Sequence, residues 1–177
     1  MSTPTWLSSA TQTLNRLASI DGSRVAILGI GNELNGDDGV GVWIASELRE
    51  QYPGNIRAEG DKTRLILSAG LAPENFTGQI RRFRADIVIM IGAADMGCEP
   101  GSVHWLQWEQ VVGMSSSTHS LPLSIVAHYL VAEVGCEVYV LAIQANVNEF
   151  GQGLSTPVAN AAQDVVHALG ALLFTRV

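Results

Sequence analysis

The stretch Val25–Leu48, VAILGIGNELNGDDGVGVWIASEL, decides the fold of this chain. Its first six residues, Val25–Ile30, are an apolar run of the length of a buried strand, and a loop with several glycines follows. From Asp38 to about Tyr52 the apolar residues recur at helical spacing. A strand that leads through a short loop into a helix is the repeating unit of α/β proteins.

The same alternation continues along the chain. ADIVIMIGA, Ala85–Ala93, is almost wholly apolar, which indicates a strand buried on both faces. We predict an α/β fold with a mainly parallel sheet covered by helices on both faces. The other expected strands are Arg64–Ser68, Val138–Ile143 and a candidate edge strand, Val103–Leu106. A further helix is expected at Pro122–Glu133. The last helix has Thr156 as its expected cap, Pro157 in its first position and an apolar stripe to Leu173.

The first 22 residues have a different pattern from the rest. Trp6, Leu7, Ala10, Leu14 and Leu17 recur at helical spacing, which predicts an amphipathic helix that packs on the domain or on a partner. We therefore divide the chain into an N-terminal helical extension, 1–22, and a single α/β domain, 23–177. No run approaches the roughly 18 apolar residues of a membrane helix, so membrane insertion is not expected.

Composition excludes several classes of protein. The chain has 177 residues, a formal net charge of -7 and a pI near 4.9, which argues against nucleic-acid binding. The one basic cluster, Arg81–Arg84, is expected to be a solvated approach to a strand. Cys98 and Cys136 lack CxxC spacing, which argues against a zinc–thiolate site. Two free thiols fit a cytoplasmic location, and one disulfide between them is the open alternative.

The glycine-rich loop is a poor phosphate site. Leu34 stands where G-x-G-x-x-G needs its third glycine, and Asp37 stands where a P-loop needs lysine. Capping of the following helix explains Asp37 or Asp38 at about even odds, because a carboxylate there accepts bonds from backbone amides. The other carboxylate of the pair is left to bind a metal or to polarise a water molecule.

Two further polar residues lie at the ends of predicted elements: Asp95 follows a strand, and His119 precedes a helix. His119 lies in SSSTHSLPL and is either a surface or capping residue or a ligand or base. Asp95 lies in GAADMG, where a role in the turn is the commoner alternative. Because sites in such sheets form beyond the carboxyl ends of strands, we expect a cleft with Asp38, Asp95 and His119, suited to a borderline divalent metal.

The pattern G-x-G-N-x-L-x-G-D-D-G-x-G, Gly29–Gly41, resembles the hydrogenase maturation protease family. Three further segments are similar to the branch that serves formate-hydrogenlyase-type hydrogenases: SAGLAPENFTGQIRRFRADIVIMIGAADMGCEPGSV, SSSTHSLPLS and YVLAIQANVNEFGQGLS. The resemblance runs from about Arg24 to Leu173. It implies a three-layer α/β sandwich and an aspartyl-type endopeptidase that removes the C-terminal extension of a nickel–iron hydrogenase large-subunit precursor already loaded with nickel.

The resemblance also implies a nickel-contacting trio, which is incomplete in this chain. Its first and last members match Asp38 and His119, but Gly92 occupies the position of the expected central aspartate. Ser68 likewise stands where related sequences often carry aspartate. Asp95, three residues after Gly92, is a possible substitute ligand. Three explanations remain open: an engineered change, a natural paralogue that binds the precursor without cutting it, and catalysis that needs only Asp38, His119 and the substrate's own nickel site.

The leading interpretation is therefore the endopeptidase, and the alternative is a non-catalytic protein that checks or holds the hydrogenase large subunit. In the enzyme, nickel either polarises the scissile carbonyl or a water molecule, with Asp38 and His119 as its ligands, or serves recognition while Asp38 is the general base. Leu34, Trp105 and Trp108 are candidates for contact with the tail of the precursor, although packing in the core or at an edge is commoner for each. The target hydrogenase, the cleavage point and the oligomeric state do not follow from the sequence.

Overall fold

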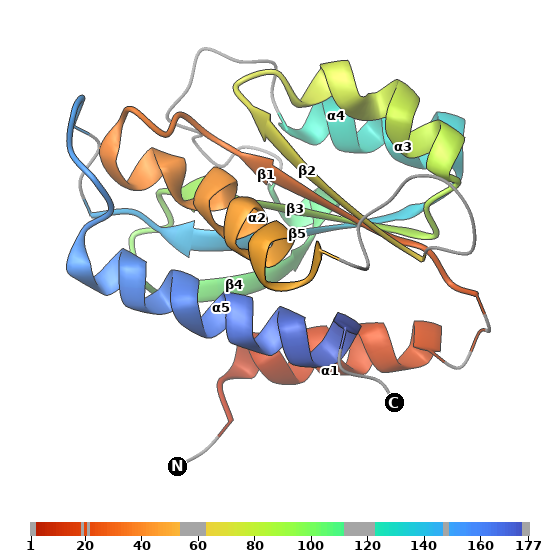
Figure 1. Ribbon diagram of the computed structural model, residues 1–177, viewed down its shortest axis with the longest axis horizontal. Coiled ribbons are helices and arrows are strands. Elements are labelled where there is room, and N and C mark those ends of the chain that lie inside the picture. The colour runs from red at the N-terminus through yellow and green to blue at the C-terminus, as the bar shows by residue number, and fades with distance from the viewer. Residues whose placement is uncertain are drawn as a thin grey trace.

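A computed structural model describes residues 3–18, 20, 22–53, 63–111, 123–146 and 149–174 of the chain. Strands and helices alternate through most of this length (Figure 1). The strands are β1 (Val25–Ile30), β2 (Arg64–Gly70), β3 (Ile87–Ala94), β4 (Val103–Gln107) and β5 (Glu137–Gln144), and the α-helices are α1 (Thr5–Ala18), α2 (Val40–Gln51), α3 (Thr77–Phe83), α4 (Leu123–Tyr129) and α5 (Thr156–Phe174).

The five strands form one sheet in the order β2-β1-β3-β5-β4. All neighbouring pairs are parallel except β4 and β5, which are antiparallel, so the expected edge strand is confirmed. From β1 the chain adds β2 on one side and β3 on the other. The order therefore reverses between β1 and β3, and open α/β sheets bind their ligands beyond the carboxyl ends of strands at such a point.

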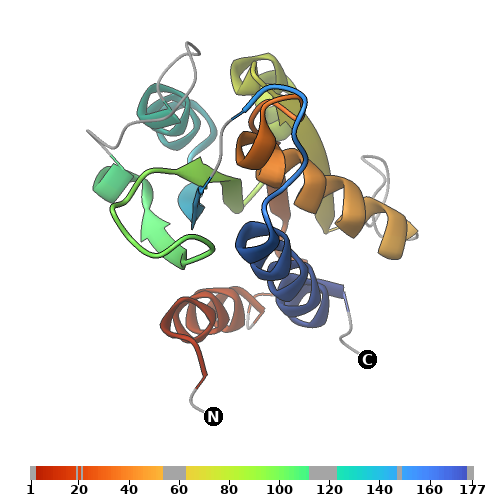
Figure 2. The same ribbon diagram turned by 90° about the vertical axis from the view of Figure 1, so that its left-hand side faces the viewer.

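Helices cover both faces of the sheet, which confirms the three-layer α/β fold (Figures 1 and 2). In β3, Ile87, Ile89 and Ile91 pack with α1, α2 and α5, whereas Val88 and Met90 pack with α3 and α4. Successive strand residues point to opposite faces, so a strand buried on both faces needs an unbroken apolar run.

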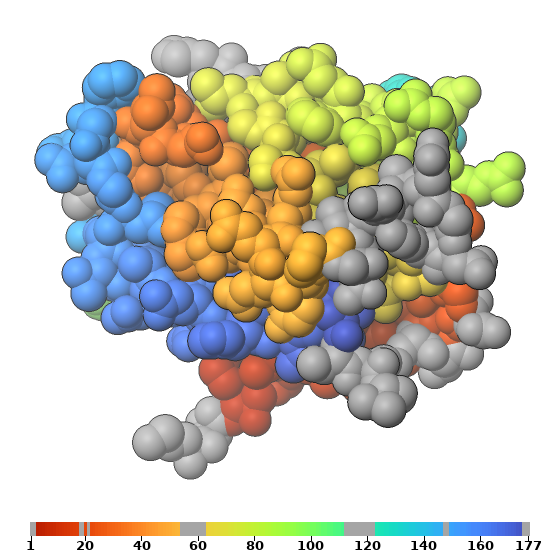
Figure 3. Space-filling model, in the orientation of Figure 1, coloured from red at the N-terminus to blue at the C-terminus, as the bar shows by residue number. Residues whose placement is uncertain are grey.

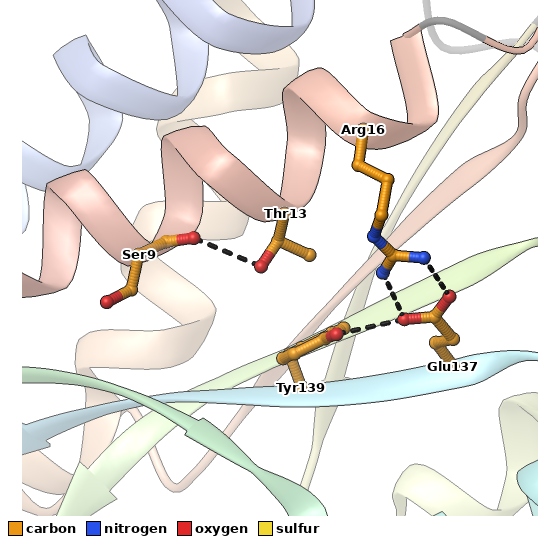
Figure 4. A network of polar contacts seen from close by, with 5 residues as sticks. All are labelled: Ser9, Thr13, Arg16, Glu137 and Tyr139. Atoms are coloured by element: carbon orange, nitrogen blue, oxygen red, sulfur yellow. Dashed lines mark hydrogen bonds and ion pairs between the residues drawn. The ribbon is translucent and has the colours of Figure 1, made fainter.

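Helix α1 packs on the same face as α2 and α5 through Leu14 and Leu17, which are buried. At its end, Arg16 donates two hydrogen bonds to the carboxylate of Glu137, at 2.9 and 2.6 Å, and the Tyr139 hydroxyl donates a third at 2.9 Å (Figure 4). The expected N-terminal helix is thus present and docked. The division of the chain at residue 22 stays a prediction.

Three expectations about the elements are wrong or incomplete. Arg81 and Arg82 belong to the last turn of α3, so the basic cluster is the end of a helix that the sequence did not indicate. Helix α5 includes Thr156, so its cap lies one residue earlier, at Ser155. Within the described residues, the helix expected at Pro122–Glu133 is α-helical from Leu123 to Tyr129 and continues as a π-helical turn, Leu130–Val134. No helix in the described part of the chain is long and apolar enough to cross a membrane.

Candidate active site at the carboxyl ends of β1 and β3

The glycines around β1 permit a close approach between α2 and the sheet. A Cβ atom at Gly41 would overlap the carbonyl oxygens of Ile91 and Ile30, and one at Gly29 would overlap the Gly41 carbonyl. A Cβ at Gly31 would overlap the carbonyl of Asp38. These glycines are therefore needed for backbone packing, which explains a glycine-rich turn that lacks the phosphate-binding patterns.

Asp37 joins the turn after β1 to a distant segment. It is fully buried, at 0% exposed, in the short 3-10 helix η1 (Gly36–Gly39). One carboxylate oxygen accepts hydrogen bonds from the Asn146 amide and the Ser155 hydroxyl, both at 2.8 Å. The other accepts the Ser155 amide at 2.7 Å. Asp37 thus holds both ends of the connection between β5 and α5.

Asp38 has a different environment. The residue is 4% exposed, and its Oδ2 accepts a hydrogen bond from the Asn32 amide at 3.1 Å. The residues that precede η1 and α2 are Asn35 and Gly39, and neither helix start has a side-chain cap. The capping alternative for these two aspartates is therefore wrong. Helix η1 lies against β3, which places Asp38 at the point where the strand order reverses.

Residue 92 has room for a side chain but offers no ligand. Gly92 follows Met90 in the alternation of β3, so a side chain there would point to the face covered by α3 and α4. A Cβ atom would lie 3.4 Å from the Ile30 carbonyl oxygen and 3.9 Å from the Ile30 Cβ, which are ordinary contacts. At Ser68 the hydroxyl is buried and has no hydrogen-bond partner among the described residues. An aspartate at 92 would thus meet no steric obstacle at its Cβ.

Asp95 stabilises its own turn. It is exposed, and one carboxylate oxygen accepts bonds from the Gly97 amide at 3.3 Å and from the Gln144 side-chain amide at 3.4 Å. Gln144, which sequence reasoning missed, is 6% exposed and accepts bonds from the Met96 and Cys98 amides at 2.7 and 3.2 Å. This lone polar residue at the end of the apolar run of β5 shapes the loop after β3.

Only part of the expected nickel-contacting trio lies within the described residues. His119 falls in 112–122 and lies outside the described residues. Within the described ranges no group of three or more histidine, cysteine, aspartate or glutamate residues is arranged to hold a metal ion. The structure places Asp38 and Gly92 on adjoining elements, η1 and β3, and leaves a single carboxylate from the expected set at this point.

Of the three apolar candidates for contact with a substrate, two have packing partners. Trp105 stacks on Tyr139 with ring centroids 5.1 Å apart, and Trp108 meets His128 edge-on at 5.9 Å. Leu34, in contrast, is 61% exposed.

Comparisons with known proteins give one consistent result. The family model described as hydrogenase maturation protease matches residues 42–171. A Methanocaldococcus jannaschii relative that carries the name of this family is 32% identical over 127 residues, 72% of this chain and 75% of that protein. The Escherichia coli hydrogenase 3 maturation protease is 29% identical over 144 residues, 81% of this chain and 86% of that one.

A solved structure matches more of the chain than these sequences do. The crystal structure of the [NiFe] hydrogenase maturation protease HycI from Thermococcus kodakarensis superposes with a TM-score of 0.77 at 29% identity. The match covers 91% of this chain and 98% of that one.

Proposed function

The chain belongs to the hydrogenase maturation protease family, a family of endopeptidases, and on that premise we propose that it removes the C-terminal extension of a nickel–iron hydrogenase large-subunit precursor. In this proposal the precursor already carries nickel, which reaches the protease as part of the substrate. The observation that supports it most is the position of Asp38. This buried carboxylate lies beyond the carboxyl ends of β1 and β3, where the strand order reverses.

Asp38 acts as a general base in the proposed reaction. It takes a proton from a water molecule as the water oxygen attacks the scissile carbonyl carbon. Asp38 then gives this proton to the departing amine nitrogen as the C–N bond breaks. His119 supplies the second polar group. In the alternative, metal-assisted version, Asp38 and His119 contact the nickel of the precursor, which polarises the carbonyl or the water. The two versions differ in whether other metals support cleavage.

Gly92 favours a second candidate function. An absent metal ligand weakens a site, and even the loss of a residue that only supports a ligand costs about 10–100-fold in metal affinity or activity. Asp95 is tied into its own turn, which makes it a poor replacement. The chain would then bind the nickel-loaded large subunit and hold or check it without cutting.

The experiment is intact-mass analysis of a nickel-loaded precursor after incubation with the chain, with a nickel-free precursor beside it. Gly92→Asp tests the missing ligand, and Gly92→Ala is the matched control because it adds a Cβ without a carboxylate. Release of the C-terminal peptide by the unaltered chain supports the protease and makes an aspartate at 92 dispensable. Release by Gly92→Asp alone identifies an inactivated form. Absence of release by all three refutes the protease proposal for that precursor.

A further inference from the structure

We propose that Leu34 and Phe150, together with Glu33 and Glu149, form a docking surface for the precursor polypeptide, which we name the Leu34–Phe150 surface. Its ligand is an apolar side chain of the substrate with a lysine or arginine close by in the chain. This inference rests on the proposed function and concerns how the same site recognises its substrate.

Leu34 and Phe150 are the two most exposed large hydrophobic residues in the described part of the chain, at 61% and 80%. They come from segments more than a hundred residues apart, yet these segments are paired. Asn35 and Phe150 form an antiparallel bridge, and the Gly151 amide donates a hydrogen bond to the Leu34 carbonyl at 2.8 Å. Figure 3 shows the two segments, orange and light blue, side by side at the upper left.

The backbone beneath this surface is held in place. Asp37, two residues after the bridged Asn35, accepts the hydrogen bonds from Asn146 and Ser155 that fix both ends of the segment carrying Phe150. A surface that is ordered before binding loses less conformational entropy when a partner arrives. Two exposed apolar side chains on such a support are therefore suited to binding rather than to packing within the domain.

The charge beside the apolar side chains determines what kind of partner fits. Glu33 directly precedes Leu34 and Glu149 directly precedes Phe150, and both glutamates are exposed. Within the described ranges neither carboxylate forms an ion pair with a lysine or arginine. A second copy of this chain, of net charge -7, would bring like charges together on this surface. A segment that is both basic and apolar complements it.

The surface is continuous with the candidate site. Asn32, whose amide donates to Asp38 at 3.1 Å, lies two residues before Leu34 in the same loop, and the Leu34 amide donates to the Asn32 side chain at 3.0 Å. A polypeptide bound on Leu34 and Phe150 would therefore pass close to Asp38. Docking at this surface places a nearby peptide bond at the reacting carboxylate, which makes it a determinant of substrate specificity.

The test is the affinity of the full chain for the nickel-loaded precursor, measured by calorimetry, with kcat and KM for peptide release. The double variant Leu34→Ser/Phe150→Ser should raise Kd and KM about 10-fold or more and change kcat little. The reason is that it removes contacts that bind the substrate equally well in the ground state and in the transition state. Ile20→Ser is the matched control, since Ile20 is 59% exposed and precedes β1 at the opposite end of the sheet. It should leave Kd and KM unchanged.

A second variant separates charge from apolar contact. Glu33→Gln/Glu149→Gln should slow association and flatten its dependence on salt, because it removes the carboxylates that attract a basic segment. A wild-type affinity in the Leu34→Ser/Phe150→Ser variant overturns the docking surface and leaves the proposed function standing. A precursor that the unaltered chain neither binds nor cleaves overturns both. If the unaltered chain associates with itself and the double variant does not, the surface binds a second copy of the chain. That result also refutes the proposal.

Discussion

The substitution Asp37→Asn tests whether the first aspartate of the pair is structural. The carboxylate accepts hydrogen bonds from the Asn146 amide and from the amide and hydroxyl of Ser155. An asparagine keeps one acceptor oxygen and turns an NH2 group toward amide hydrogens that need an acceptor. A hydrogen bond to a charged group contributes about 1.5–3 kcal/mol, and a buried donor left without a partner costs about 1–3 kcal/mol.

We therefore expect Asp37→Asn to lower the free energy of unfolding by about 2–4 kcal/mol. For a chain of this length that corresponds to a fall in Tm of about 4–16 °C, measured by calorimetry or circular dichroism. The same variant should increase hydrogen exchange in the segment 149–155, because Ser155 at its end and Asn146 ahead of it lose their attachment to η1.

Asp38→Asn is the control, because it makes the same chemical change one residue later. The Asn32 amide, which donates to Oδ2 of Asp38 at 3.1 Å, can still find an acceptor oxygen in asparagine. Its Tm should fall much less than that of Asp37→Asn. Equal Tm values for Asp37→Asn and the unaltered chain, or a larger loss in Asp38→Asn, would refute the assignment of the structural role to Asp37.

Three further outcomes follow from other parts of the molecule. Arg16 holds the pKa of Glu137 below its usual range, so this pair stabilises the fold above about pH 4.3 and loses its effect as pH falls through the lowered pKa. Glu137→Gln should therefore lower the free energy of unfolding by at most about 1 kcal/mol at pH 7, because the pair is largely exposed. Well below pH 4 the same variant should cost nothing. Burial raises the pKa of the Cys136 thiol to about 11, so iodoacetamide at pH 8 should label exposed Cys98 alone in the native chain, as read by intact mass. Gly41→Ala should destabilise the fold by about 3 kcal/mol or more in urea unfolding, because its Cβ would overlap two strand carbonyls.

Each of these outcomes has a result that contradicts it. A Glu137→Gln chain that loses clearly more than about 1 kcal/mol at pH 7, or that keeps its loss well below pH 4, would contradict this account of the Arg16 pair. Rapid labelling of both thiols would show that Cys136 is not buried in solution. Gly78→Ala is the control for Gly41→Ala, because a Cβ in α3 meets only the flexible end of Arg82, at 3.7 Å. It should be neutral or stabilising, and equal losses in the two variants would argue against the close packing of α2.

Local patterns in the sequence were enough to predict the sheet. The apolar run of β3 predicts a central strand because only a strand covered on both faces needs apolar residues at successive positions. Helix α3 was missed because it is short and only Ile80 and Phe83 mark its buried side. Seven residues with two buried positions do not establish a helical period.

The roles within the site depend on contacts that are distant in sequence. Asp37 and Asp38 are adjacent and chemically identical, and helix capping was the local explanation for either. What distinguishes them is that Asn146 and Ser155, more than a hundred residues later, donate to Asp37. The role of Gln144 in the loop after β3 likewise requires knowing that β5 lies beside β3. No local spacing rule contains that information.

The most direct test of the proposed role of Asp38 is the rate at which the C-terminal peptide leaves a nickel-loaded large-subunit precursor. Intact-mass analysis would follow the unaltered chain, Asp38→Asn and Asp37→Asn, each at the same concentration of folded protein. We predict release by the unaltered chain, residual release by Asp37→Asn, and loss of release by a folded Asp38→Asn. Release by Asp38→Asn at the unaltered rate would contradict the assignment of Asp38 as the reacting carboxylate.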